Sequence, residues 1–166
     1  VIHCLPGTTA TLTAASWDGF EIIGAAYNVA LAGRSIDGTL FDGAVVTGIG
    51  EATTTQPIFV NCSIGAATIP PAVLRGCGIG HSSGTFTAPA DSGEYLFHIC
   101  FSEVPGASSP ALDFSAINGV TGINNRGWFG GSTYTLNTNC TLSHECVGGG
   151  GTTITPADAA IGYAAK

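Results

Sequence analysis

Apolar and polar residues alternate with a period of two along much of this chain. In the clearest run, Ile23, Ala25, Tyr27, Val29 and Leu31 fall on one side of an extended segment. The same alternation runs through two other long segments and several shorter ones, at 95–101, 134–142, 9–15, 39–48, 57–64, 84–88 and 126–129. A period of two is that of a β-strand with one face buried, so the pattern predicts a protein made mainly of short strands.

Turn signals separate these segments at short spacing. They are Asp18-Gly19, Asp37-Gly38, Asp42-Gly43, Pro105-Gly106, Asn118-Gly119 and Gly130-Gly131. Short strands joined by Gly, Pro, Asn and Asp favour an antiparallel β-sandwich, of jelly-roll or immunoglobulin-like type. Ser109-Pro110 before 111–117 and Thr155-Pro156 before 157–161 predict a few short helical turns. We expect a single domain over 1–166, with an N-terminal strand at about 1–16 that can be exchanged between copies and a C-terminal tail at about 148–166.

One strand pair carries a family resemblance. The run Gly84-Thr85-Phe86-Thr87-Ala88-Pro89, followed by Gly93-Glu94-Tyr95-Leu96-Phe97-His98-Ile99, resembles a strand pair of the complement and tumour-necrosis-factor-like jelly rolls. Asp91 to Tyr95 is also similar to the tyrosine corner of immunoglobulin-like domains. Both resemblances imply that Tyr95 begins a central strand of a β-sandwich.

The chain is poor in charge. Only 9% of its residues are Asp, Glu, Lys or Arg, the net charge is −7, and the mean hydropathy is +0.37. Four basic residues (Arg34, Arg75, Arg126 and Lys166) cannot form the clustered positive surface that nucleic acid requires. Residues 52–74 lack charge but are interrupted by Gln56, Asn61 and Pro70-Pro71, so no membrane span is expected. A surface with so few ionic groups needs hydroxyl-rich strand faces, attached glycan or neighbouring copies to solvate or cover it.

Six cysteines indicate an oxidising compartment and a disulfide framework. The shortest loops would be closed by Cys62 with Cys77 and by Cys140 with Cys146, which leaves Cys4 with Cys100. The chain contains no methionine and opens Val1-Ile2-His3-Cys4, as a mature secreted form would. Two glycosylation acceptor patterns begin at Asn61 and Asn139.

Several residues are candidates for chemistry. Gly80-His81-Ser82-Ser83-Gly84 fits a nucleophile elbow, in which Ser82 would act with His144 and with Asp113 or Asp91, but the strand before it and the helix after it are missing from the pattern. His3-Cys4, His98-x-Cys100 and His144-x-Cys146 could offer metal ligands, although disulfides next to incidental histidines are the simpler interpretation. The three Asp-Gly steps lack calcium-loop spacing. Glu21, Glu51, Glu94, Glu103 and Asp113 could supply the paired carboxylates of a glycoside hydrolase, but the sequence does not give their separations, and scattered acids are usually solvated surface groups. Neither a metal nor another cofactor is therefore expected. Trp17 and Trp128-Phe129 could stack on sugars, but they are more typical of a core.

Three functions remain. The first is a structural subunit of an extracellular fibre or surface layer, because the composition resembles that of chain-linked pilins. Strand complementation would join the copies, with the assembly strand formed by Thr9, Thr11, Leu12, Thr13 and Ala14. The alternative is a secreted glycan- or protein-recognition module of jelly-roll type. The third is a small serine hydrolase that uses Ser82. We expect the first, with no enzymatic activity.

Overall fold

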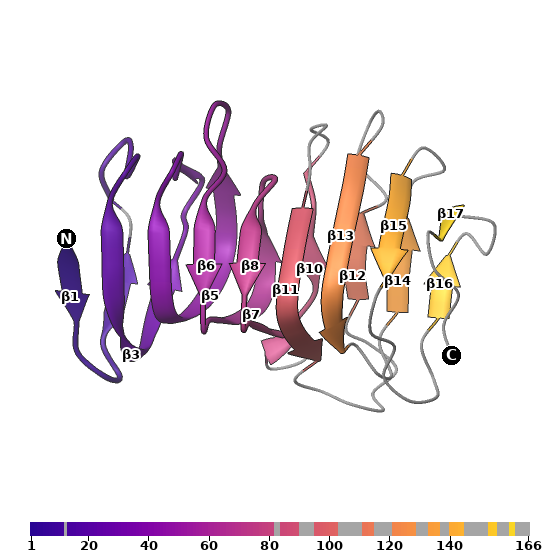
Figure 1. The fold of residues 1–166 in the computed structure, drawn as a ribbon. Coiled ribbons are helices and arrows are strands. Elements are labelled where there is room, and N and C mark those ends of the chain that lie inside the picture. The colour runs from indigo at the N-terminus through magenta and orange to yellow at the C-terminus, as the bar shows by residue number, and fades with distance from the viewer. Residues whose placement is uncertain are drawn as a thin grey trace.

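The chain of this protein winds into a coil, and its strands pair in parallel with strands of the next turn. The computed structural model describes residues 1–11, 13–81, 84–89, 95, 96, 98 and 100, and the backbone of residues 97, 99, 101 and 102 and of six later strands. The described residues form a sheet of seventeen strands, and every pairing in it is parallel. Figure 1 shows the strands stacked from the indigo N-terminal end to the yellow C-terminal end. This is a β-solenoid.

The strands lie on three faces of the coil, as the pairing partners show. The first face is formed by β1 (Ile2–Cys4), the start of β3 (Glu21–Ala30), the start of β5 (Leu40–Glu51), β6 (Ile58–Val60), β8 (Val73–Arg75), β11 (Tyr95–Ser102), β13 (Thr121–Trp128), β15 (Cys140–His144) and β17 (Ala160–Ile161).

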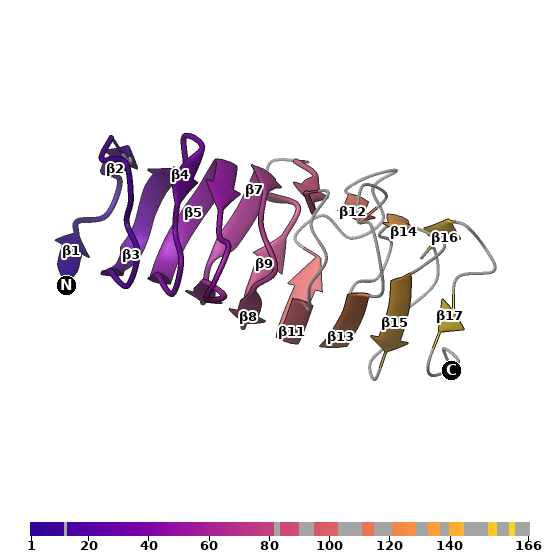
Figure 2. The same ribbon diagram turned by 90° about the horizontal axis from the view of Figure 1, so that it is seen from above.

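The second face continues from the same rungs. It contains β2 (Thr9–Thr11), the end of β3, the middle of β5, the start of β7 (Ser63–Thr68), β9 (Gly78–Ile79) and the end of β11. The third face contains β4 (Arg34–Ser35), the ends of β5 and β7, β10 (Phe86–Thr87), β12 (Ala111–Phe114), β14 (Thr133–Leu136) and β16 (Thr153–Thr155). Figure 2 shows the stack from above.

Long strands change face at a bend. In β3 the register shifts between Ile23 and Tyr27, and Ala26 adopts a φ of 52° there. The buried side chains are therefore Ile22 before the bend and Tyr27, Val29 and Leu31 after it. The sequence pattern correctly predicts that Tyr27, Val29 and Leu31 are buried. It wrongly places Ile23 on the same side of the strand, because the bend interrupts the alternation of buried and exposed residues.

The core consists of columns of inward-facing residues from successive rungs. Phe41 and Phe59 stack with ring centroids 5.0 Å apart and planes 8° from parallel. Phe86 meets Tyr95 edge to face at 5.9 Å. Two buried hydroxyls are satisfied by backbone: Tyr27 donates to the carbonyl of Ile22 at 2.6 Å, and Tyr95 donates to the carbonyl of Ile69 at 2.7 Å. The Phe41–Phe59 stack and the Tyr95 hydrogen bond thus join successive rungs, whereas the Tyr27 hydrogen bond lies within β3.

The expected antiparallel β-sandwich, whether jelly-roll or immunoglobulin-like, is wrong. A period of two describes any strand with one buried face and does not distinguish parallel from antiparallel pairing. The glycines of the Asp-Gly steps do adopt positive φ (69° at Gly19, 62° at Gly38 and 75° at Gly43), but they turn corners of a coil and do not close hairpins. The segment 111–114, where a helical turn is expected from the sequence, is strand β12, and 160–161 is strand β17.

The predicted disulfide framework is also wrong for the described cysteines. Cys4, Cys62, Cys77 and Cys100 are free thiols. Cys4 lies in the first rung, in register with Gly24, whereas Cys100 lies several rungs further along the stack, so these two cannot be joined. Cys140 begins β15, with only its backbone described, and Cys146 lies outside the described residues.

Candidate functional site

The third face presents a row of small side chains to solvent. Ile49 of β5 is in register with Thr68 of β7, and Thr68 is in register with Thr87 of β10. Between these outward positions, Ala67 and Phe86 are buried. Successive residues of a strand point to opposite sides, so Thr85 and Thr87 share the outer side with Thr68. The backbone register continues from Thr87 through Asp113, Thr135 and Thr155.

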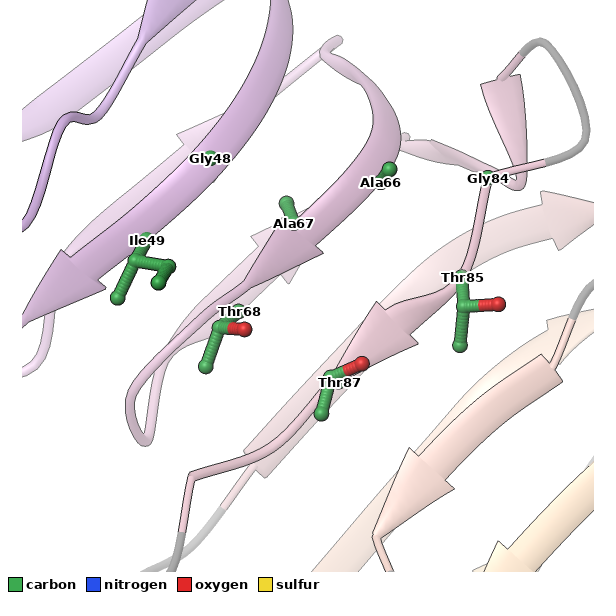
Figure 3. A pocket seen from close by; sticks show the side chains of 8 residues that line it. All are labelled: Gly48, Ile49, Ala66, Ala67, Thr68, Gly84, Thr85 and Thr87. Atoms are coloured by element: carbon green, nitrogen blue, oxygen red, sulfur yellow. The ribbon is translucent and has the colours of Figure 1, made fainter.

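A shallow, open hollow lies in this row of strands. Its volume is about 500 Å³, and Figure 3 shows its lining, which is Gly48, Ile49, Ala66, Ala67, Thr68, Gly84, Thr85 and Thr87. Gly84 lets two strands of the lining approach closely, because a Cβ at this position would lie 2.2 Å from the backbone nitrogen of Ala66. The lining has no charged and no aromatic side chain. It offers threonine hydroxyls and methyls, which suit a neutral polar surface and provide no group for acid–base chemistry.

The outer edge of β1 is a second exposed feature. β1 pairs with β3 along one edge. Among the described residues, no other strand pairs with β1. Val1 and Leu5, which flank β1, are 71% and 72% exposed. The unpaired backbone groups of such an edge can pair with another strand, and proteins usually protect an edge of this kind with charged side chains. Ile2, His3 and Cys4 form the edge, and none is an acid, a lysine or an arginine.

The two residues of the predicted serine hydrolase that the structure places, Asp113 and His144, lie on different faces of the coil. Ser82 and Asp91 lie outside the described residues. Asp113 belongs to β12 on the third face and His144 to β15 on the first face. The elbow segment runs from the short strand β9 to the short strand β10, with no helix among the residues described after it.

The two described histidine–cysteine pairs, His3-Cys4 and His98-x-Cys100, do not belong to a metal site of three or more ligands among the described residues. Cys100 is buried and His98 is only half-buried, because the register of β11 shifts between His98 and Phe101 and ends the alternation. In the part of the chain that the structure describes, no group of three or more His, Cys, Asp or Glu side chains could hold a metal ion. His144 and Cys146 cannot be placed in this way, since their side chains lie outside the description.

Asp37 has a structural role. Its carboxylate accepts hydrogen bonds from the backbone N–H groups of Thr53, Thr54 and Thr55, at 2.8, 3.0 and 3.1 Å. Burial raises the pKa of Asp37, but the bonds from Thr54, Thr55 and Thr53 outweigh it and lower the pKa to about 2. The Asp37-Gly38 step is thus a corner held by a carboxylate, in keeping with its interpretation as a turn.

The remaining predicted residues have mixed positions. Asn61 is exposed at a corner with a φ of 51° and donates to Asp42, so its side chain is accessible, while Asn139 lies outside the described residues. Trp17 packs against the core and meets Phe20 edge to face at 5.5 Å, as the core interpretation requires. The expected assembly strand is paired within its own chain, with Thr9 and Thr11 in register with Asn28 and Ala30.

The hollow of the third face is not predicted from the sequence. Its signal is present as the repeated Thr-x-Thr pattern at Thr85, Thr133 and Thr153, which indicates only strand propensity when taken alone. Comparison with known proteins adds nothing to the geometry: no family model, no curated protein and no solved structure matches this chain. No helix among the described residues is long and apolar enough to cross a membrane.

Proposed function

We propose that this chain is a structural subunit of an extracellular fibre, in which solenoids join end to end by parallel pairing of their rungs. The observation that supports this most directly is the parallel stack itself, to which β1 offers the hydrogen-bonding groups of its outer edge beside the exposed side chains of Val1 and Leu5. A terminal rung of a second copy would continue the parallel hydrogen bonding and bury both side chains. The two ends of one solenoid differ, so the contact is heterologous and builds an open filament.

This proposal changes the mode of assembly expected from the sequence. Strand β2 is already paired with β3 and is therefore not free to be donated to a neighbour. Rung stacking needs no strand exchange, because each copy keeps its own strands and adds only the hydrogen bonds at its ends. It also agrees with the absence of acids, lysines and arginines from Ile2, His3 and Cys4, since a strand that stacks on another copy would bury ions at its edge.

Filament formation by the purified protein tests the proposal. We expect negative-stain electron microscopy to show filaments whose width is that of one coil, and light scattering to show mass that grows with concentration. The double variant Val1→Asp/Leu5→Asp should remain monomeric, because stacking would bury two carboxylates. Ile49→Asp is the matched control, since Ile49 is 54% exposed but lies on a flank. Wild-type protein that stays monomeric at its solubility limit, or equal loss of filaments in the control, would contradict the proposal.

A second candidate function is recognition of a neutral polysaccharide by the third face. The threonine-lined hollow of about 500 Å³ favours it, because hydroxyl groups at strand spacing can bond to a repeating chain of sugar hydroxyls. Affinity electrophoresis in gels that contain hydroxyethyl cellulose tests it. Thr68→Val with Thr87→Val removes both hydroxyls at nearly constant volume and should abolish retardation, and an unretarded wild-type protein would exclude this ligand.

A further inference from the structure

Three buried thiols form a continuous column inside the coil. Ser63 is in register with Gly78, and Gly78 with Phe101, so the residues before them, Cys62, Cys77 and Cys100, occupy equivalent positions in successive rungs. Their exposed fractions are 1%, 0% and 1%. Cys77 contacts both neighbours through its sulfur, as the mutual hydrogen bonds of the three side chains show. Neither the fibre nor the polysaccharide proposal uses these groups.

Backbone carbonyl oxygens surround the column in a repeating way. The sulfur of Cys62 lies 3.5 and 3.2 Å from the carbonyl oxygens of Phe41 and Val60. Cys77 has the same relation to Phe59 and Arg75, at 3.4 and 3.5 Å, and Cys100 to Leu74 and His98, at 3.5 and 3.8 Å. The thiols donate to these oxygens, and the negative ends of the carbonyl dipoles, which point at the sulfurs, favour a positive charge in the column.

The spacing of the rungs matches the length of a linear sulfur–metal–sulfur unit. A zinc–thiolate bond is about 2.3 Å long, and with a bond of about this length an ion in line between two sulfurs needs them about 4.6 Å apart. Equivalent positions on paired strands lie about 4.7–4.9 Å apart. Three sulfurs in one column cannot converge on a single ion, in agreement with the absence of a cluster of three or more ligands in the described residues.

We propose that neighbouring thiols of this column hold a soft monovalent metal ion of the copper(I) class in linear two-sulfur coordination, with Cys77 as the shared ligand. Thiolates select such ions over harder ones. Cys77 can pair with Cys62 or with Cys100, whereas Cys62 and Cys100 are separated by two strand spacings, about 9.5 Å, and cannot share an ion. The column therefore holds one ion at a time.

The binding step requires no oxidant or reductant. The ion forms one bond to the sulfur of Cys77 and one to the neighbouring sulfur, the S–H bond of each thiol breaks, and the two protons leave to solvent.

Silver(I) is the probe, because it shares the linear thiolate chemistry and does not change oxidation state. The starting protein carries Cys4→Ser, Cys140→Ser and Cys146→Ser, which leaves only the column. We expect native mass spectrometry to show one Ag⁺ per folded chain. Cys62→Ala and Cys100→Ala each leave an adjacent pair and should keep the ion, whereas Cys77→Ala should weaken binding by at least tenfold although it removes the same atoms.

Two further variants keep the test decisive. Cys77→Val preserves volume in case alanine opens a cavity that unfolds the chain, and Cys62→Ala/Cys100→Ala leaves Cys77 alone; both should lose the ion while circular dichroism reports an intact fold. Equal binding by the Cys77→Ala and Cys62→Ala variants would overturn the proposal, because it would show that adjacency in the column does not matter. A folded starting protein that takes up no Ag⁺ would overturn it as well.

Discussion

Three glycines allow the cost of close rung stacking to be separated from the cost of backbone conformation. Gly33 has a φ of +67° and open space where a Cβ would lie, whereas Gly84 has an ordinary φ and would place its Cβ 2.2 Å from the backbone nitrogen of Ala66. Gly43 has both features, with a φ of +75° and a Cβ position 2.1 Å from the carbonyl oxygen of Gly24 in the preceding rung. Alanine substitutions at these positions therefore form a matched set.

The expected free energies follow from these contacts. An L-residue at positive φ costs about 1–2 kcal/mol, and a stiffer unfolded chain returns about 0.4–1 kcal/mol, so Gly33→Ala should destabilise by about 1 kcal/mol. Gly43→Ala must also push two rungs apart, because a Cβ cannot lie that close to a backbone oxygen. We expect its loss to reach about 4 kcal/mol, which is in the exceptional range for one substitution. Gly84→Ala should lie between these two values.

Urea unfolding followed by circular dichroism measures these differences. With a slope of about 2 kcal/mol per molar urea, the midpoint should fall by about 0.5 M for Gly33→Ala and by about 2 M for Gly43→Ala. Equal midpoints for the two variants would refute the reasoning, because they would show that the rung before Gly43 does not approach as closely as the parallel register requires.

Two other predictions concern the corner and the core. Asp37→Asn should destabilise the protein by about 1 kcal/mol at neutral pH, because three N–H bonds to a partly exposed carboxylate weaken. The folded-state pKa of Asp37 is about 2, below the usual value of 3.8, so its stabilisation is present above about pH 4 and is lost as the pH falls toward 2. A difference in free energy of unfolding between variant and wild type that stays the same from pH 7 to pH 2 would contradict this. For the stacked rings, a double-mutant cycle of Phe41→Leu and Phe59→Leu should give a coupling of about 0.5–1.5 kcal/mol by urea unfolding. Phe41→Leu with Phe86→Leu is the control and should be additive; a zero coupling for the first pair would show that the rings do not interact.

The sequence is sufficient to predict strands and many of their buried residues. Tyr27, Val29 and Leu31 are placed correctly because alternation reports burial directly. The direction of pairing cannot be obtained this way, since parallel and antiparallel strands share the period of two. The Asp-Gly steps point to hairpins because a hairpin and a solenoid corner both need a residue at positive φ.

The repeating architecture is hidden by unequal turns of the coil. Ile58 pairs with Val73, whereas Tyr95 pairs with Ile123, so the chain has no fixed period that a search for repeats would detect. Pairing the cysteines by loop length does bring Cys62 and Cys77 together, but they are stacked thiols. Stacking of like residues depends on register, and register is visible only once the turns have been aligned. The threonine-lined hollow escapes prediction for the same reason.

The parallel stack also determines how the molecule would respond to force. Its strands run across the long axis, so the hydrogen bonds between rungs point along it. A pull on the two ends would load one interface after another, and each rung touches only its neighbours, so the coil would part at its weakest interface while the others stayed closed. Bending has to stretch whichever of the three faces lies on the outside of the curve, so the same hydrogen bonds between rungs resist bending in every direction.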